Sequence, residues 1–305
     1  MRILASTGPL FARPLDWALG VMAEAGFDGV ELMVTQDPAT QDPERVVEAM
    51  RTEGIAAPVV HGPFLLITRR VFGTDLVTKA RRSVELAGTI GADLMVVHPP
   101  FRWQRGFHRW LLEESDVEAA AHDTRVGVEN LYPVTVRGRP VRFHRYTDPE
   151  HLLPFTNVVL DTSHLGVAGV DIVEAYELLW DRIAHLHVSD YRGEGKDSHA
   201  PLGHGVLPLG RFLHRVGRDE PDATTAAAEV HRSRGTSITL ELDCRRYLED
   251  RAALVGYLRQ ERRKCADLLA GGSPEEVLGR PDVVQVAPGL DEDDADQPTA
   301  GPPPR

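Results

Sequence analysis

The chain lacks the features that mark secreted and membrane-spanning proteins. Its 305 residues include only two cysteines, Cys244 and Cys265, which show neither a CxxC motif nor the spacing of a disulfide framework. We therefore expect both to be reduced and structural in a cytosolic protein. No run of about 18 apolar residues occurs, so no membrane-spanning helix is expected. The N-terminal segment MRILASTGPLF has no cationic start or long apolar stretch, unlike a signal peptide, and is expected to form a first strand.

Positive charge is also scarce, since the formal net charge is −12. Half of that excess lies in residues 271–305, which hold eight acidic residues and two arginines. This segment, which includes APGLDEDDADQPTAGPPPR, is predicted to be a disordered tail because few large apolar groups accompany its acids and prolines. The remaining body is mildly acidic. That disfavours a nucleic-acid partner, although it leaves room for a local basic groove.

Short apolar runs alternate with helical segments along the rest of the chain. Eight runs are predicted to be strands, at residues 3–6, 29–34, 57–61, 94–98, 125–130, 157–161, 183–190 and 237–242. The clearest helices are expected at 14–26, 43–54, 74–91, 170–180 and 248–269. This alternation is typical of βα units around a parallel sheet. The sequence therefore predicts an α/β protein with a single (β/α)8 TIM barrel over residues 1–270, followed by the tail.

Polar residues stand where six consecutive predicted strands end. Because side chains alternate along a strand, the apolar neighbours of each residue indicate which way it points. In SITLEL, for example, the outward Leu240 and Leu242 turn Glu241 inward. The same argument places six inward residues at the carboxyl ends of the strands, where barrel enzymes carry their active sites: His61, His98, Glu129, Asp161, His187 and Glu241.

Each of these residues alone has a plainer explanation. A single histidine is usually a hydrogen-bonded core residue, as we expect for His185, and a single aspartate usually caps a helix. Six on one rim are different, because buried unpaired charges are costly and Arg125 is the only cation among the inward residues. A divalent ion would offset that cost, and the mixed ligands favour Mn, Zn or Co over Mg. The predicted ring is extended from adjacent loops by His164, Asp197 and His199.

Two arginine-rich segments follow the fourth and fifth predicted strands. They are PPFRWQRGFHRW (99–110) and YPVTVRGRPVRFHRY (132–146). As a cationic lid they would contact a phosphorylated or carboxylated ligand, with Arg102, Trp103, Arg137 and Arg142 as the candidate substrate-binding residues. The alternative is a solvated loop or a subunit contact, and the apolar loop residues are compatible with a homodimer.

The motifs together resemble the xylose isomerase-like TIM barrels, a superfamily that includes sugar (phosphate) isomerases and epimerases and endonuclease IV. The matching pieces span most of residues 1–270: VVHGPFL, VVHPP, GVENL, LDTSH, HLHVSD, DSHAPLGHG and LEL. The resemblance implies a four-ligand metal site at Glu129, Asp161, His187 and Glu241. In endonuclease IV-type members a cluster of three zinc ions has further ligands, which correspond here to His61, His98, His164, Asp197 and His199.

The resemblance leaves three functions open. The first is a metal-dependent isomerase or epimerase of a sugar or sugar phosphate, with one divalent ion and with Glu129 and Glu241 moving a proton alpha to a carbonyl. The second is a zinc phosphodiesterase of the endonuclease IV type, which would bind up to three zinc ions. The third is a non-catalytic sugar-binding barrel, which the presence of both glutamates disfavours.

Overall fold

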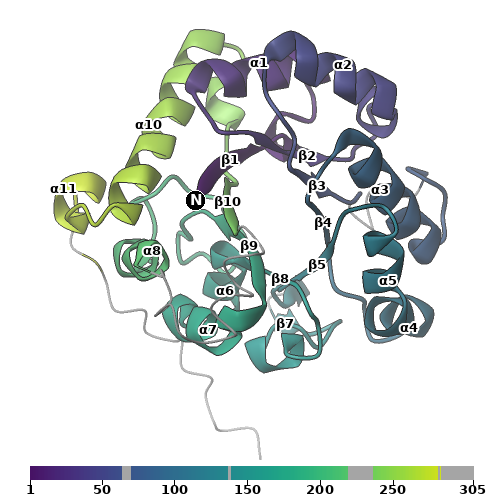
Figure 1. Cartoon of the computed structure of the whole chain (residues 1–305). Helices are drawn as coiled ribbons and strands as arrows, with labels where there is room; N and C mark the ends of the chain where they lie inside the picture. Colours follow the sequence, from purple (N-terminus) through teal and green to yellow (C-terminus); the bar gives the residue numbers. More distant parts are fainter. Residues whose placement is uncertain (64–69, 137–138, 219–235, 281, 283–305) are drawn as a thin grey trace, which may run out of the picture.

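Eight parallel strands close into a barrel in the computed structural model, which describes residues 1–63, 70–136, 139–218, 236–280 and 282 (Figure 1). The last barrel strand pairs with the first and closes the sheet. The barrel strands match the eight predicted runs and confirm the TIM barrel. They are β1 (Arg2–Ser6), β2 (Val30–Met33), β3 (Val59–His61), β4 (Leu94–Val97), β5 (Val126–Glu129), β8 (Val158–Asp161), β9 (Ile183–Val188) and β10 (Ser237–Leu240).

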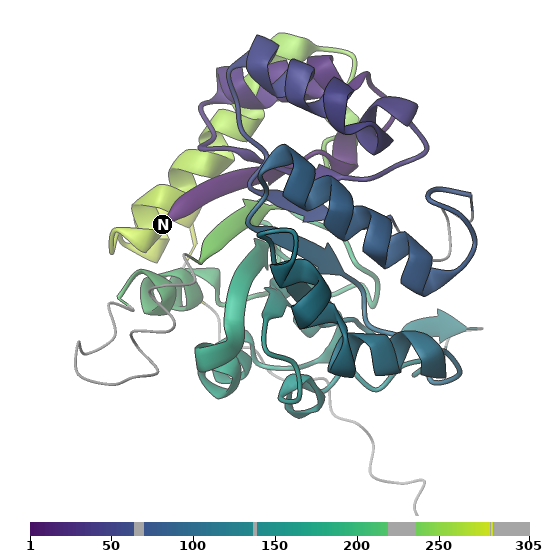
Figure 2. The same cartoon turned by 45° about the vertical axis from the view of Figure 1, so that its right-hand side comes forward.

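Helices surround the barrel, and those next to one another in space pack together (Figures 1 and 2). All five helices predicted from the sequence are present: α1 (Leu15–Ala25), α2 (Pro43–Glu53), α3 (Leu76–Ile90), α7 (Ile172–Leu179) and α10 (Arg251–Leu269). Aspartates cap the first turns of four of them, and the side chain of Asp42, for instance, accepts from the N–H groups of Glu44 and Arg45. In the part of the chain that is described, no helix is both long and apolar enough to cross a bilayer.

The segments that were expected to be loops contain further regular structure. After β4 come α4 (Arg105–Glu113) and α5 (Ser115–Ala120), and after β5 comes the hairpin of β6 (Val134–Val136) and β7 (Arg139–Val141). Two more helices are α6 (Thr162–Ala168) and α8 (Leu209–Gly217). Helix α4 forms because Phe107, Trp110 and Leu111 share one buried face, a pattern that the intervening arginines and histidine disguise in the sequence.

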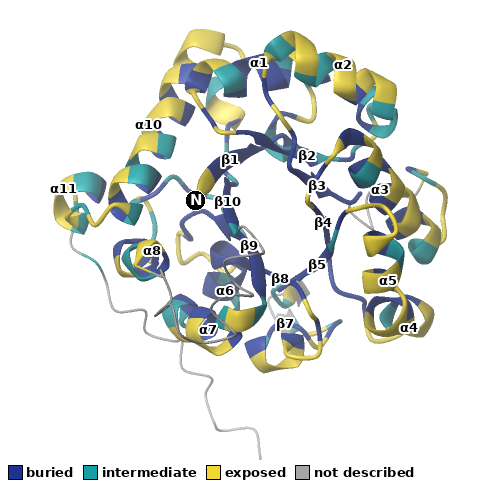
Figure 3. Ribbon diagram, in the orientation of Figure 1, coloured by how far each residue is buried: buried dark blue, intermediate teal, exposed yellow. Residues whose placement is uncertain are grey.

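The interior of the barrel has an apolar layer and a polar layer. The apolar layer contains Leu4, Val59, Leu94, Val96, Val159 and Ala184. The histidines and carboxylates follow two residues later on several strands, as His61 follows Val59 and His98 follows Val96, so they lie one layer nearer the carboxyl ends. Figure 3 shows these strands as almost entirely buried, with exposed residues on the surrounding helices and loops.

The folded part of the chain extends beyond residue 270, where the barrel was expected to end. Helix α11 (Pro274–Leu278) packs against α8 and α10 and buries Leu278. Arg280 then forms an ion pair with the fully buried Asp190, at 3.0 Å. The boundary predicted from composition is therefore too early, because Leu278 and Arg280 anchor this segment together with Asp282, which accepts from the N–H groups of Gly210 and Arg211. The rest of the predicted tail, from residue 283, lies outside the described residues.

The two cysteines have the structural role expected of them. Both are free and buried, Cys244 beside β10 and Cys265 in α10. Burial raises the pKa of each thiol to about 12, which leaves almost no reactive thiolate at neutral pH.

Candidate metal centre

The six inward residues predicted at the strand ends lie together at one mouth of the barrel. Their strands are neighbours in the sheet, in the order β3, β4, β5, β8, β9 and β10. Five of the residues are buried, and the side chain of Glu241 is 12% exposed. The parity argument is thus confirmed for the whole set: His61, His98, Glu129, Asp161, His187 and Glu241.

Glu129 lies at the centre of the cluster, and its two oxygens face different pairs of histidines. Oε2 is 3.3 Å from His61 Nε2 and 3.0 Å from His98 Nε2. Oε1 is 3.2 Å from His187 Nδ1 and 3.3 Å from His164 Nδ1. Burial alone would raise the pKa of Glu129, but the imidazoles of His98 and His187 hold it well below its usual value. The residue is therefore a buried anion whose surroundings are suited to positive charge.

A central group forms around Nδ1 of His187. This atom faces Glu129 Oε1 at 3.2 Å, Asp161 Oδ2 at 3.8 Å and Glu241 Oε2 at 3.9 Å. Ligand atoms of one metal ion lie at about these separations, since each is about 2 Å from the ion. We call Glu129, Asp161, His187 and Glu241 the central group.

Asp161 both caps a helix and contributes to the central group. Its Oδ1 accepts from the backbone N–H of His164 and from the hydroxyl of Ser163. The bond to the N–H of His164 is an N-cap for α6. Its Oδ2 is buried and has no hydrogen-bond partner among the described residues. Burial raises the pKa of this carboxyl group. A buried oxygen without a partner is costly, and a cation in the central group would supply one.

Two further groups flank the central one. His61, His98 and Glu129 bring three ligand atoms close enough to hold an ion. On the other side, Asp197 Oδ2 lies 2.7 Å from His199 Nε2 and 3.5 Å from His164 Nε2. All nine residues predicted for one or more ions are therefore brought together in three adjacent groups. Glu129 belongs to two of them, and His164 Nδ1, 3.3 Å from Glu129 Oε1, joins the third to the central group.

Hydrogen bonds fix the orientation of three of the histidines. His61 Nδ1 donates to the carbonyl of Gly62, and His164 Nδ1 donates to the carbonyl of Asn130. His187 Nε2 contacts Glu31 Oε2 at 3.0 Å. In each case the other ring nitrogen faces a carboxylate. If this nitrogen were unprotonated, its lone pair would repel those of the carboxylate oxygen. It therefore either carries a proton or faces a metal ion.

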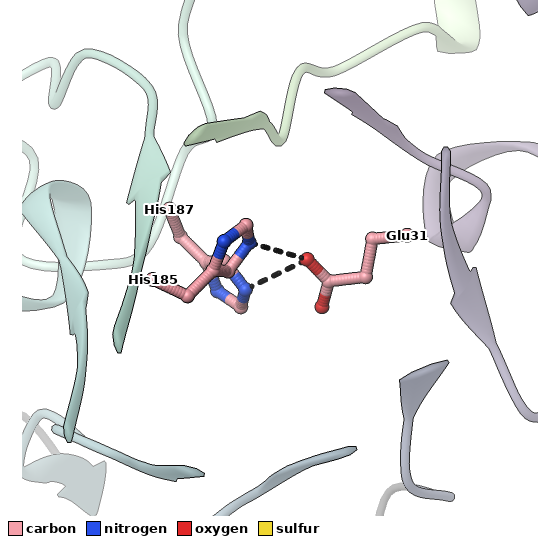
Figure 4. A group of neighbouring side chains, drawn as sticks. All are labelled: Glu31, His185 and His187. Carbon is pink, nitrogen blue, oxygen red and sulfur yellow. Dashed lines mark hydrogen bonds and ion pairs between the residues drawn. The ribbon is translucent and has the colours of Figure 1, made fainter. Parts of the chain in front are cut away.

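Glu31 is a residue of this cluster that the sequence reasoning missed. It lies on β2, is fully buried, and contacts His187 and His185 through the same oxygen (Figure 4). Its neighbours Val30 and Leu32 point outward, so alternation along the strand turns Glu31 inward, as it does for the six predicted residues. His185 itself bonds Ser237 and Thr239 as well, as a buried structural residue would, and with Glu31 and His187 it also brings three ligand atoms close enough to hold an ion.

The charge balance of the cluster favours bound cations. Burial would lower the pKa of His187, but Glu31, Glu241 and Glu129 raise it well above the usual value. Burial would also lower the pKa of His164, but Asp161, Asp197 and Glu129 raise it well above the usual value. For His199 burial is outweighed by Asp197, and the pKa rises to about 9. Without a metal the cluster therefore holds protons, and a metal ion would replace them. The residues fit a divalent ion.

The predicted lid residues lie outside this cluster. Trp103 is 63% exposed and stacks on Phe101, while Arg102 and Arg142 are exposed. The two arginine-rich segments do contact each other, since the N–H of Arg102 donates to the carbonyl of Phe143. Arg137 lies outside the described residues.

Fold and site together define a class, the TIM barrels that carry their chemistry at the carboxyl ends of the strands. Residues 19–246 match the family model described as the xylose isomerase-like TIM barrel, and the chain belongs to that family.

Comparison with individual proteins agrees with this assignment. An uncharacterised protein of Mycobacterium leprae is 31% identical over 227 residues, which cover 68% of this chain and 81% of that protein. Among solved structures, a D-tagatose 3-epimerase-like protein superposes with a TM-score of 0.58 at 20% identity, covering 87% of this chain and 99% of the other. An L-ribulose 3-epimerase superposes with a TM-score of 0.60 at 16% identity, covering 88% of this chain and 95% of that protein. At these identities the structural likeness concerns the fold.

Proposed function

We propose that this protein is a divalent metal-dependent isomerase or epimerase of a sugar or sugar phosphate. The observation that carries the proposal is the central group, in which His187 Nδ1 faces three carboxylates while Glu31 holds Nε2. The epimerases among the solved structures of this fold favour the same class of reaction.

In this proposal the central group binds one ion. Bound there, a divalent ion supplies Lewis-acid polarisation of a substrate carbonyl. Two residues of the group also have roles in proton transfer. Glu241 is partly open at the mouth and makes only the longer contacts, so we assign it removal of the proton alpha to the carbonyl. Glu129 is assigned the return of a proton. Because its lowered pKa leaves it an anion, it must first receive that proton, and the protonated imidazole of His164, 3.3 Å from Oε1, is a source.

The test is exchange of the substrate's alpha proton for deuterium. The metal-loaded protein is incubated with a panel of ketoses and ketose phosphates in D2O, and incorporation is followed by NMR. We expect exchange with at least one member of the panel, and a loss of about 10²- to 10⁴-fold in Glu241→Gln with the ion still bound.

Glu249→Gln is the control, because Glu249 is an almost fully exposed residue paired with Arg13 away from the cluster. Full exchange activity in Glu241→Gln would disprove the acid–base assignment. Absence of exchange with every compound, in protein shown by elemental analysis to hold its ion, would disprove the proposed function.

A second candidate is a zinc phosphodiesterase of the endonuclease IV type. The specific observation in its favour is that Glu129 presents one oxygen to His61 and His98 and the other to His187, as a carboxylate between two ions would. Three tightly bound zinc ions per chain, together with cleavage of a duplex containing an abasic site, would establish this function. A single ion without cleavage would favour the isomerase.

A further inference from the structure

A cleft of about 190 Å³ lies where the segments after β4 and β5 meet. Its lining includes Arg102, Arg105 and Arg145, together with Phe101, His108 and Tyr146. We call it the cationic cleft. It is smaller than an ordinary ligand pocket of about 300–1,000 Å³, so it suits one substituent group of a ligand better than a drug-sized molecule.

The charge of the cationic cleft is unusual for this protein. No acidic residue lines it, and in the described part of the chain none of its three arginines has an ionic partner. The chain as a whole has a net charge of −12. Three positive charges gathered on an acidic protein repel one another, and a bound anion would relieve that repulsion.

Helix α4 adds to the positive potential. The cleft is lined by Gln104 and Arg105, which are the N-cap and the first residue of this helix. The N-terminus of a helix carries a partial positive charge and normally attracts acidic side chains. The first turn of α4 contains none, and Gln104 provides no capping hydrogen bond because its side chain accepts from the N–H of Phe101. Arginine at this position is locally unfavourable, which points to a ligand.

The cleft adjoins the barrel mouth. Phe101 is three residues beyond His98, and the carbonyl of Tyr146 accepts from the N–H of Leu131, two residues beyond Glu129. The ring of Phe101 also lies 6.4 Å from that of His144, whose Nε2 bonds the carbonyl of Tyr132. The ring of Tyr132 in turn contacts His164 at 4.8 Å. Two residues, His144 and Tyr132, therefore link the lining of the cleft to the candidate metal centre.

We propose that the cationic cleft binds the phosphate group of a small phosphorylated substrate. As a statement about substrate class the proposal rests on the proposed function, whereas phosphate binding itself does not. The guanidinium groups provide paired donors that match phosphate oxygens, and the N-terminus of α4 adds its partial positive charge.

The test is a titration of the metal-loaded full chain with D-fructose 6-phosphate, D-fructose and inorganic phosphate, observed by NMR. We expect the sugar phosphate to bind more tightly than the unphosphorylated sugar. In the double variant Arg102→Ala/Arg145→Ala the affinity for both phosphate compounds should fall by about 10- to 100-fold. Arg109→Ala is the matched control, since Arg109 is an exposed arginine of the same helix outside the cleft, and its affinities should be unchanged.

Equal phosphate affinity in the wild type and the double variant would overturn the proposal, because the phosphate would then be held elsewhere. It is also overturned if a short single-stranded oligonucleotide binds more tightly than the sugar phosphate and with a steep salt dependence, since the cleft would then serve a nucleic-acid backbone. Deuterium exchange in the same preparations separates the two proposals. If phosphate binds through these arginines but no substrate proton exchanges for deuterium, the proposed function is disproved and the phosphate site stands.

Discussion

At the scale of single residues, the position of Glu31 explains how a histidine can be aimed at a metal ion. His187 offers Nδ1 to the central group only while its Nε2 is held, and Glu31 Oε2 is 3.0 Å from that atom. The same oxygen is 3.1 Å from His185, whose own bonds to Ser237 and Thr239 fix its position. A carboxylate behind a ligating histidine sets the ring orientation and strengthens the ligand. Glu31 is thus a positioning residue for His187.

Replacing Glu31 tests this role. In Glu31→Gln we expect the affinity for the divalent ion to fall by about 10- to 100-fold, because the amide orients His187 less firmly and removes the negative charge behind it. The measurement is competition with a chelator of known affinity. Glu261→Gln is the control. Glu261 is a buried glutamate of α10, outside the barrel, and it bonds the N–H of Leu202 and the side chain of Lys264. An unchanged metal affinity in Glu31→Gln, with the fold intact by circular dichroism, would refute the positioning role.

At the scale of elements, the segment after α10 holds a loop of the site in place. Asp190 is buried and accepts from the backbone N–H groups of Tyr191, Gly203, Gly205 and Leu207, which draws the loop between them into a closed turn. That loop carries Asp197 and His199. Arg280 completes the arrangement by bonding Asp190 and the carbonyls of Gly203 and Leu207. The end of the folded chain therefore contributes to the arrangement of the metal ligands.

Arg280→Ala is expected to lower the free energy of unfolding by about 2 kcal/mol, because it leaves a buried carboxylate without its charged partner. Urea unfolding followed by circular dichroism measures the change. Arg51→Ala is the control, since Arg51 pairs with Glu48 on the exposed face of α2, where solvent screens the pair and its loss should leave stability almost unchanged. A chain shortened to residue 270 should be destabilised at least as much as Arg280→Ala. Equal stability of all these proteins would show that the segment is not anchored as described.

At the scale of the whole molecule, periodicity was enough to predict the barrel and most of its site. Strand parity is a local property, so it placed Glu129, Asp161 and Glu241 correctly without any knowledge of the fold. Parity also turns Glu31 inward, but it cannot assign a role that depends on distant partners. The role of Glu31 depends on His187, more than 150 positions away, and Arg280 is informative only beside Asp190. Helix α4 was missed for another reason, because its charged residues dominate the sequence pattern while its three buried ones decide the structure.

The cluster as a whole predicts that metal binding, protonation and stability are linked. The carboxylates raise the pKa values of His164 and His187 well above the usual value and that of His199 to about 9, so these imidazoles are largely protonated at pH 7 in the metal-free protein. An ion that binds to His187 Nδ1 must displace a proton. Affinity is therefore expected to fall as the pH decreases, and binding at pH 7 should release at least one proton.

Calorimetry in two buffers with different ionisation enthalpies would count the released protons, and thermal unfolding would report stability. At a free ion concentration of 100 times Kd the folded state gains about 2.7 kcal/mol. For a domain of this size that corresponds to a rise in Tm of roughly 5–10 °C, which a chelator should reverse. The same titration in His187→Ala should show neither the proton release nor the rise in Tm. Equal heats in the two buffers, or a Tm that does not respond to the ion, would contradict a metal centre built on these residues.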